Sequence, residues 1–383
     1  MGKIVALTRL TVFDENFQMY DGMEEVIIAL HNEGHTVVFI SHTDESLKIA
    51  NEIFKEVFDF KVLCHYRKVI KKLKGTDKVK DTIIVGSSNN DLFLATELKT
   101  LIINPGWSDI REAMPARYGI TLDTPQKLLE AIRIIDNQNS WYFNLFIDEC
   151  SKVISLTSAN TYNSDITVQE KEVVEGFSKL LKKGDRKYFN SLYFHLISGI
   201  MKDEHLKSVD IWGVFPTSTG NVNEEIEELK ERCRYLTGKK QKQPIFIRHT
   251  AVSKSHHTSY IERLNVGCAK HLDSIIINPH YTKKKLKGKK VCIIDDYLTN
   301  GISFETARNL LLAAGVEQVI LLSLGRFKRG NNGFYQMENY EIKGDIYNVG
   351  YDYSKIDTEN LIGEYDDAAR DEIKNIYNII YNT

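Results

Sequence analysis

The sequence lacks any long hydrophobic run. No stretch approaches the roughly 18 to 20 uncharged apolar residues that a membrane-spanning helix needs. The apolar segment after Lys3 is interrupted by Arg9, too soon for the hydrophobic region of a secretory signal peptide. We therefore expect no membrane partner and a cytoplasmic location, and we predict that the chain opens with a buried β-strand.

Paired cysteines are also missing. The five cysteines form no C-x-x-C pair and show no cysteine–histidine spacing typical of zinc; they are Cys64, Cys150, Cys233, Cys268 and Cys292. This usage argues against a disulfide framework and against a structural zinc ion, and it favours a reducing compartment.

Charge of one sign is not in excess either. The formal net charge is −2 over 383 residues, so no overall basic field attracts nucleic acid, and we expect no direct reading of DNA. Two local basic runs, Arg67–Lys74 and Lys283–Lys290, are interpreted as solvated faces, although the second leads into the motif described below and is placed to attract a polyanion. The length and the 42% share of hydrophobic residues are typical of a globular protein with two domains.

Residues 1–136 alternate short apolar segments with amphipathic ones. This alternation predicts a parallel sheet with helices on its faces. Strands are expected at Ile4–Leu7, Thr36–Ile40, Thr82–Val85 and Thr100–Ile103, and helices at Gly22–Gly34, Ser46–Phe58, Asp91–Glu97 and Thr124–Ile135.

The remainder of the chain is predicted to hold a helical connector over residues 137–206 and a second α/β domain over residues 207–383. Strands of that domain are expected at Val209–Phe215, Pro244–Ile247, Ser274–Ile277, Lys290–Ile294 and Gln318–Leu324. A final helix, Asp366–Tyr381, is expected to pack back on the body. The predicted fold class is therefore α/β, with two Rossmann-like parallel-sheet domains joined by a helical segment.

The strongest motif is Val291–Ser303, VCIIDDYLTNGIS. Its apolar start predicts a buried strand, and Asp295 and Asp296 follow at the carboxyl end, where open α/β sheets bind their ligands. A short polar loop then leads to an amphipathic helix over Phe304–Ala314. Such a loop offers backbone N–H groups and the positive end of a helix dipole to a phosphate, while adjacent carboxylates suit sugar hydroxyls or a cation.

These residues resemble the motif of type I phosphoribosyltransferases that binds 5-phosphoribosyl-1-pyrophosphate (PRPP). Asn300 departs from the family, which usually has a second Thr there, but an amide can still donate to a phosphate oxygen. The resemblance implies that Asp295 and Asp296 hold the ribose hydroxyls, directly or through Mg²⁺. It assigns the 5′-phosphate to Thr299, Asn300, Gly301, Ile302 and Ser303. The implied reaction displaces pyrophosphate at the anomeric carbon through an oxocarbenium-like state.

Two upstream stretches fit the same family. The loop where the family places its pyrophosphate-binding segment is Pro216, Thr217, Ser218, Thr219 and Gly220, with an ordinary turn as the alternative. Arg248 and the later Arg263–Val266 are similar to the Arg…Arg-x-x-Asn-Val stretch of the competence-factor-type, amidophosphoribosyltransferase-like branch. The resemblance implies a flexible catalytic hood here, with Lys254 and Arg263 in catalysis and Arg248 in substrate binding.

Acid–base and acceptor-binding residues are less clearly marked. His256 and His257 are candidates for a general acid or base in the hood, with surface histidines of no role as the alternative. After the last core strand, Phe327 is a candidate for stacking on a base, and Arg326 or Lys328 for pairing with an anion. The alternative is that these residues have no ligand to bind and simply end a strand with solvated charges.

The first domain is similar to haloacid dehalogenase-like phosphohydrolases that have lost their nucleophile. The family's two aspartates after the first strand are replaced by Thr8 and Leu10, whereas Ser41 matches the second motif. A lysine for the third motif is sought among Lys68, Lys71 and Lys72, and the fourth motif keeps Ser87 and a single acid, Asp91. One carboxylate is too few for Mg²⁺. We expect no hydrolysis, and either phosphate binding or a structural or oligomerising role.

The leading expectation is a phosphoribosyltransferase that uses PRPP and Mg²⁺ and acts on a nucleobase, a nucleotide or a related acceptor. The alternatives are a regulator that senses PRPP or a nucleotide, and a stress or phage-defence effector acting on nucleotide pools. The intact acid pair favours catalysis. A homo-oligomer or a protein partner bound through the N-terminal domain is the expected form of assembly.

Overall fold

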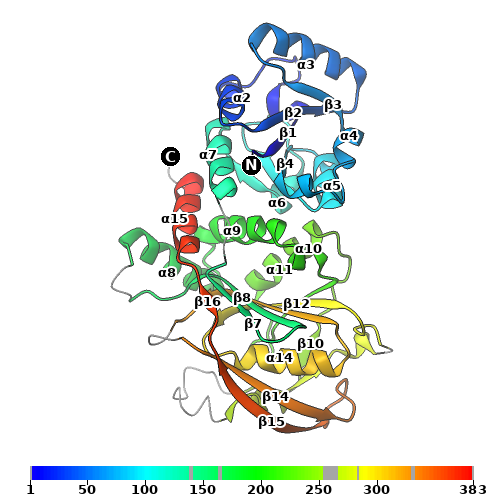
Figure 1. The fold of residues 1–383 in the computed structure, drawn as a ribbon, viewed down its shortest axis with the longest axis vertical. Coiled ribbons are helices and arrows are strands. Elements are labelled where there is room, and N and C mark those ends of the chain that lie inside the picture. Colours follow the sequence, from blue (N-terminus) through cyan, green and yellow to red (C-terminus); the bar gives the residue numbers. More distant parts are fainter. Residues whose placement is uncertain are drawn as a thin grey trace.

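The computed structural model describes residues 2–137, 141–162, 166–252, 266–282, 284–328 and 333–381. Two sheets and a layer of helices between them are arranged along the long axis of the molecule (Figure 1). The hood candidates Lys254, His256, His257 and Arg263 lie outside the described residues.

The N-terminal domain is built on a six-stranded parallel sheet of order β3-β2-β1-β4-β5-β6. Its strands are β1 (Ile4–Thr8), β2 (Thr36–Ser41), β3 (Leu63–Tyr66), β4 (Thr82–Val85), β5 (Leu101–Pro105) and β6 (Ile120–Leu122). Its helices are α1 (Arg9–Val12), α2 (Met23–Asn32), α3 (Asp44–Val57), α4 (Arg67–Lys71), α5 (Asn89–Leu98), α6 (Ala113–Tyr118) and α7 (Pro125–Asn137). The predicted Rossmann-like parallel sheet is confirmed for this domain.

The second sheet is mixed, with the order β16-β7-β8-β13-β12-β9. Its strands are β7 (Phe143–Phe146), β8 (Ser151–Ser158), β9 (Ile211–Val214), β12 (Lys290–Leu298), β13 (Gln318–Arg326) and β16 (Glu364–Tyr365). The four strands β8, β13, β12 and β9 run parallel, whereas β7 and β16 pair antiparallel at one edge. The expected second parallel sheet is therefore only partly present.

The interpretation of residues 137–206 as a helical connector is wrong for residues 143–146 and 151–158. These residues form β7 and β8, and β8 pairs directly with β13 in the core of the second sheet. Every residue of β8 is buried. A strand that is buried on both faces shows no polar–apolar alternation, so its sequence has no period of two that would distinguish it from a helix.

A layer of helices separates the two sheets and packs against both. It contains α8 (Val168–Lys183), α9 (Phe189–Lys202), α10 (Glu204–Ser208), α11 (Glu224–Leu236) and α15 (Ala368–Tyr381). A single apolar cluster extends from Val5 in the first sheet through Leu196 in α9 to Leu322 in the second sheet. The C-terminal helix α15 packs on α7, α8 and α9, which confirms the expected return of the tail to the body (Figure 1).

The other face of the second sheet carries α14 (Ile302–Ala313) and two small antiparallel sheets. These sheets pair β10 (Phe246–Arg248) with β11 (Ile275–Ile277), and β14 (Tyr335–Lys343) with β15 (Asp352–Leu361). The short helix α13 (Ala269–Leu272) lies near the first pair. The β14–β15 hairpin was not predicted, because β15 is exposed along most of its length and its polar sequence has no alternating apolar face.

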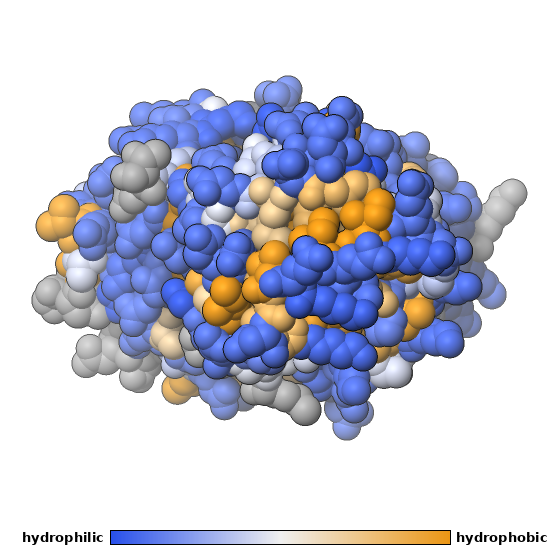
Figure 2. Space-filling model, turned by 90° about the horizontal axis from the view of Figure 1, so that it is seen from above, coloured by the Kyte–Doolittle hydropathy of each residue, from blue (hydrophilic) through white to orange (hydrophobic). Residues whose placement is uncertain are grey.

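The surface of the N-terminal domain is mostly hydrophilic. Seen from above, an apolar patch interrupts this surface and is bordered by hydrophilic residues (Figure 2). Across the described ranges, none of the helices combines the length and the apolar character that crossing a bilayer requires.

Candidate functional site

A cavity of about 720 Å³ lies at the carboxyl ends of β9, β12 and β13. Its walls include Asp295 and Asp296, the loop Thr299–Ser303, and Pro216, Thr217 and Ser218. Two separate loops that the sequence marks as phosphate-binding candidates therefore share one cavity with the acid pair. Thr219 and Gly220, from the same upstream loop, do not line it.

The acid pair lies within β12, which continues to Leu298 rather than ending before Asp295. The N–H of Asp296 donates to Oδ1 of Asp295 at 2.9 Å, and the N–H of Tyr297 donates to Oδ1 of Asp296 at 2.6 Å. Burial raises the pKa of Asp295 well above its usual range, and the neighbouring Asp296 carboxylate adds to that rise. Burial likewise raises the pKa of Asp296. Ionising both carboxyls is thus costly until a cation or a positively charged sugar offsets their charge.

The loop after the acids is shaped by a glycine at the start of α14. Gly301 has a φ of +100°, and a Cβ there would lie 2.5 Å from Cε2 of Tyr335. The side-chain Nδ2 of Asn300 is buried and has no hydrogen-bond partner among the described residues. An unsatisfied amide donor beside the N-terminus of a helix is suited to an anionic oxygen.

The buried side chain of Arg326 stabilises the Thr299–Ser303 loop from the protein interior. Its guanidinium donates to the carbonyl oxygen of Thr299 at 3.0 Å and to that of Phe334 at 3.1 Å, and the side chain is fully buried. The suggestion that Arg326 pairs with a ligand is therefore wrong, since its donors are used inside the protein. Lys328 places its ammonium 4.5 Å from the ring centroid of Tyr365 and does not line the cavity, whereas Phe327 does.

Arg248 supports the upstream loop. Its Nε donates to the carbonyl oxygen of Thr217 at 2.7 Å, its Nη2 to that of Pro216 at 3.3 Å, and its Nη1 to Oγ of Ser274 at 2.5 Å. Burial lowers the pKa of Arg248 to about 10, and the Asp295 carboxylate opposes that change. The residue borders the cavity, yet most of its donors fix the loop, so its main role in this geometry is positioning.

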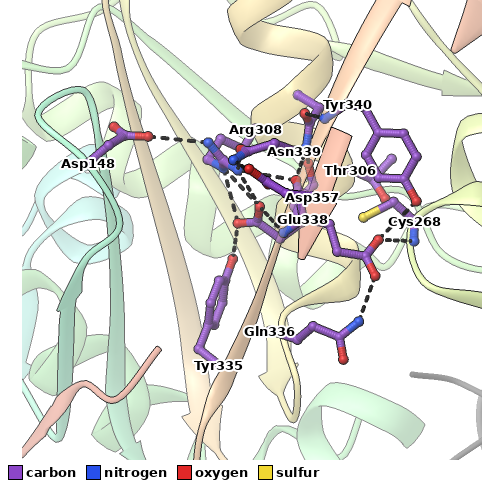
Figure 3. Close-up of polar contacts among 12 residues, drawn as sticks. Asp148, Cys268, Thr306, Arg308, Tyr335, Gln336, Glu338, Asn339, Tyr340 and Asp357 are labelled. Carbon is purple, nitrogen blue, oxygen red and sulfur yellow. Dashed lines mark hydrogen bonds and ion pairs between the residues drawn. The ribbon is translucent and has the colours of Figure 1, made fainter. Parts of the chain in front are cut away.

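A buried polar network lies behind α14 and joins this helix to the β14–β15 hairpin (Figure 3). Glu305 accepts from Oη of Tyr335 at 2.6 Å and from Nη2 of Arg308 at 2.6 Å. Arg308 also donates to Oδ1 of Asn339 at 2.6 Å, and Glu338 accepts from the N–H of Cys268 at 2.9 Å. The ring of Tyr335, which restricts Gly301, is thus fixed by a buried ion pair.

Replacing Arg308 with Met is expected to lower the free energy of unfolding by about 3–5 kcal/mol, because it leaves the Glu305 carboxylate buried without its cation. The two side chains are 3% and 0% exposed. A matched control is Lys171→Met, which breaks an exposed pair with Glu175 and should cost less than about 0.5 kcal/mol. Urea denaturation measures both, and equally small losses would contradict a structural role for the network.

Lys182 is a cavity residue that sequence reasoning missed. It lies in the last turn of α8, and its Nζ is 5.3 Å from the ring centroid of Tyr297. The nearby ammonium opposes the burial-driven rise in the pKa of Asp296. In the sequence, Lys182 and Lys183 are ordinary basic residues at a helix C-terminus, so only the tertiary packing identifies one of them as a cavity residue.

The N-terminal domain has its own pocket, of about 460 Å³, at the carboxyl ends of β1 and β2. Thr8, Ser41 and Asp91 line it, as the phosphatase resemblance predicts, whereas Ser87 is buried outside it. The basic residues that line the pocket are Arg9, His42 and Arg67, and none of the lysines proposed for the third motif lines it. Arg67 forms an ion pair with Asp91, which also accepts from Oγ1 of Thr8 at 3.4 Å.

This pairing leaves no carboxylate in the pocket available for a metal or for nucleophilic attack on phosphorus, apart from Glu15 at its rim. The full-length protein is expected not to hydrolyse p-nitrophenyl phosphate in the presence of Mg²⁺, and the Asp91→Asn variant should be equally inactive. Release of inorganic phosphate is the measurement. Hydrolysis by the wild type that disappears in Asp91→Asn would contradict this expectation.

The residues around the acid pair fit Mg²⁺ of the kind that binds together with a phosphorylated substrate. Within the described ranges, no three His, Cys, Asp or Glu side chains gather as a metal site. Mg²⁺ commonly uses one or two carboxylates and completes its coordination with water and substrate phosphates. Asp295 and Asp296 supply such a pair and lie beside two candidate phosphate loops.

No family model matches the chain, and no curated protein matches it either. Among solved structures, a weak likeness to the GsuK channel covers 84% of this chain and 61% of the channel chain, with 12% sequence identity and a TM-score of 0.21. A TM-score this low carries no argument about fold or function, so the functional interpretation depends on the geometry of the cavity.

Proposed function

We propose that the protein is a phosphoribosyltransferase that uses PRPP and Mg²⁺, with its active site in the cavity around Asp295 and Asp296. One observation carries the proposal: the acid pair, the Thr299–Ser303 loop and the Pro216–Ser218 loop border the same cavity. PRPP has three matching parts, namely a ribose with two hydroxyls, a 5′-phosphate and a pyrophosphate.

The assignment of these parts follows from the chemistry of the donors. The Thr299–Ser303 loop offers N–H groups at the start of α14 and the unpaired Nδ2 of Asn300, and it binds the 5′-phosphate. The Pro216–Ser218 loop, held by Arg248, binds the pyrophosphate. Asp295 and Asp296 line the same cavity as the two loops and accept from the ribose hydroxyls.

In the reaction, the acceptor forms a bond to the anomeric carbon of PRPP while the bond from that carbon to the pyrophosphate oxygen breaks. Pyrophosphate leaves with the bonding electron pair, and an acceptor N–H, where present, releases its proton to solvent. The carboxylates of Asp295 and Asp296 stabilise the positive charge that develops on the ribose. When bound by these carboxylates and the substrate, Mg²⁺ would neutralise the charge of the leaving group.

Two features of the chain make this arrangement preorganised for catalysis. Arg326 and Tyr335 fix the Thr299–Ser303 loop through buried contacts, so little ordering is left to occur when the phosphate binds. Arg248 does the same for the opposite loop. Because the donors are held in place before the reaction, their stabilisation of charge is not reduced by reorganisation.

Turnover tests the proposal. With Mg²⁺ and PRPP, the full-length protein should release pyrophosphate in the presence of an acceptor from a panel of nucleobases, nucleotides and aromatic acids. A regulator that senses PRPP or a nucleotide, or an effector that acts on nucleotide pools without PRPP, would give no such release. Absence of acceptor-dependent release across the panel, together with failure to bind PRPP, would reject the proposal.

A further inference from the structure

The position of Lys182 is set by the helical layer rather than by the loops of the sheet. It lies beside Leu181 at the end of α8, and both residues border the cavity. Asn223, the N-cap residue of α11, donates from Nδ2 to the carbonyl oxygen of Leu181 at 2.8 Å. This contact fixes the end of α8 against the cavity and directs a lysine toward Tyr297.

Two aromatic rings border the cavity next to Lys182. Tyr297 follows the acid pair on β12, and Phe327 follows β13, the neighbouring parallel strand. Their ring centroids are 5.3 Å apart, and the ring planes meet at 43°. Aromatic walls of this kind favour planar ligands. Stacked or edge-to-face ring contacts contribute binding free energy beyond that of the apolar area they bury.

The strand order places Phe327 on the side of the acid pair away from the pyrophosphate-loop candidate, whereas Tyr297 lies on the same strand as the acids. The Pro216–Ser218 loop follows β9, the acids lie on β12, and Phe327 follows β13, in the spatial order β9, β12, β13. A displacement at the anomeric carbon needs the acceptor and the leaving group on opposite sides of the ribose. Phe327 meets this requirement by strand order, and Tyr297 and Lys182 adjoin it through their ring and cation contacts. This part of the cavity, bordered by Lys182, Tyr297 and Phe327 and here called the aromatic end, is therefore a suitable location for an acceptor.

We propose that the aromatic end binds the acceptor, and that the acceptor is a planar ring carrying a carboxylate or another anionic group; this inference rests on the proposed transferase function. An anionic ring next to Asp296 would be repelled unless a cation lies beside both groups. The Lys182 ammonium, 5.3 Å from the Tyr297 ring, supplies that cation. A neutral ring would stack in the same way but would gain less from the lysine, because it carries no negative charge to pair with the ammonium.

The test compares matched acceptors that differ in one carboxyl group. Orotate and uracil, nicotinate and nicotinamide, and anthranilate and aniline are assayed by pyrophosphate release from PRPP with Mg²⁺. Variants are Lys182→Gln, which removes the charge, and Lys182→Arg, which keeps it. The matched control is Lys183→Gln, because Lys183 is in the same helical turn and does not line the cavity. PRPP affinity is measured in parallel by calorimetry.

We expect the wild type to use a carboxylate-bearing ring in preference to its neutral partner. Lys182→Gln should raise the KM for that acid by about tenfold or more, as expected for the loss of a charge-assisted contact, and this loss should exceed any change in PRPP affinity. Lys182→Arg should retain most of the preference, and Lys183→Gln all of it.

Three results would overturn the inference while leaving the transferase function in place. They are a preference for neutral rings, no use of any acid, and a loss of PRPP affinity in Lys182→Gln that accounts for the whole effect on turnover. Failure of the wild type to bind PRPP would instead reject the proposed function, and this inference with it.

Discussion

Replacing Asp295 and Asp296 together with asparagine should lower phosphoribosyl transfer by at least about 10³-fold, the scale of loss when preorganised charge stabilisation is removed. The asparagines keep the shape of the side chains and can still contact hydroxyls. They cannot stabilise positive charge on the ribose or share in binding Mg²⁺. The measurement is pyrophosphate release from PRPP under saturating acceptor.

The same variant should be more stable than the wild type at neutral pH. Burial raises the pKa of Asp295 and of Asp296 in the folded protein, so the folded state holds protons that the unfolded state releases. Stability is therefore lost as pH rises from the usual carboxyl range through the raised pKa values. Asparagine does not titrate, so the variant avoids this loss.

Thermal unfolding at pH 7 and at pH 4.5 separates the two effects. The stability advantage of the double asparagine variant should be larger at pH 7 than at pH 4.5, because the raised pKa values favour protonation of the folded wild-type carboxyls as the pH falls. A variant that loses both activity and stability would show that the acids hold the fold together rather than serve a ligand.

Replacing Gly301 with alanine should lower kcat/KM for PRPP by about 100-fold, a typical effect of misplacing a binding group by about 1 Å. The added Cβ would lie 2.5 Å from Cε2 of Tyr335, and an alanine at a φ of +100° is strained in any surroundings. Tyr335 cannot move aside easily, because its hydroxyl donates to the buried Glu305. The loop must shift instead, and its N–H donors shift with it.

A glycine at the other end of the same helix gives the control. Gly315 has a φ of +79°, and a Cβ there would have its closest contact at 3.4 Å, with Cγ of Lys287. Gly315→Ala should cost about 1 kcal/mol of stability, the usual penalty for a left-handed alanine, and leave PRPP kinetics unchanged. Similar kinetic losses in both variants would mean that strain in α14, rather than the shape of the phosphate loop, controls activity.

The sequence was most informative where structure and chemistry are contiguous in the chain. The strand, acid pair, loop and helix of Val291–Ala313 form one local unit, and the structure places the acids and the loop on a cavity as predicted. The parallel sheet of the first domain was predictable for the same reason, since each strand and helix carries its own pattern of hydrophobic residues.

Features that depend on tertiary packing were not predictable. Lys182 enters the cavity only because α8 packs beside α11, and Arg67 rather than a lysine meets Asp91 because α4 begins at the end of β3. The sequence marks Arg326 as a candidate ligand contact, but its position on β13 buries it behind the loop. Neither the position of these residues in the sequence nor their charge predicts the environment of each side chain in the folded protein.

The most direct test of the central claim is a calorimetric titration of PRPP with Mg²⁺ into the wild type and into the double asparagine variant of Asp295 and Asp296. We predict a single binding event in the wild type and its loss in the variant, with both proteins folded. No binding to the wild type, or equal binding to both proteins, would contradict the assignment of this cavity to PRPP.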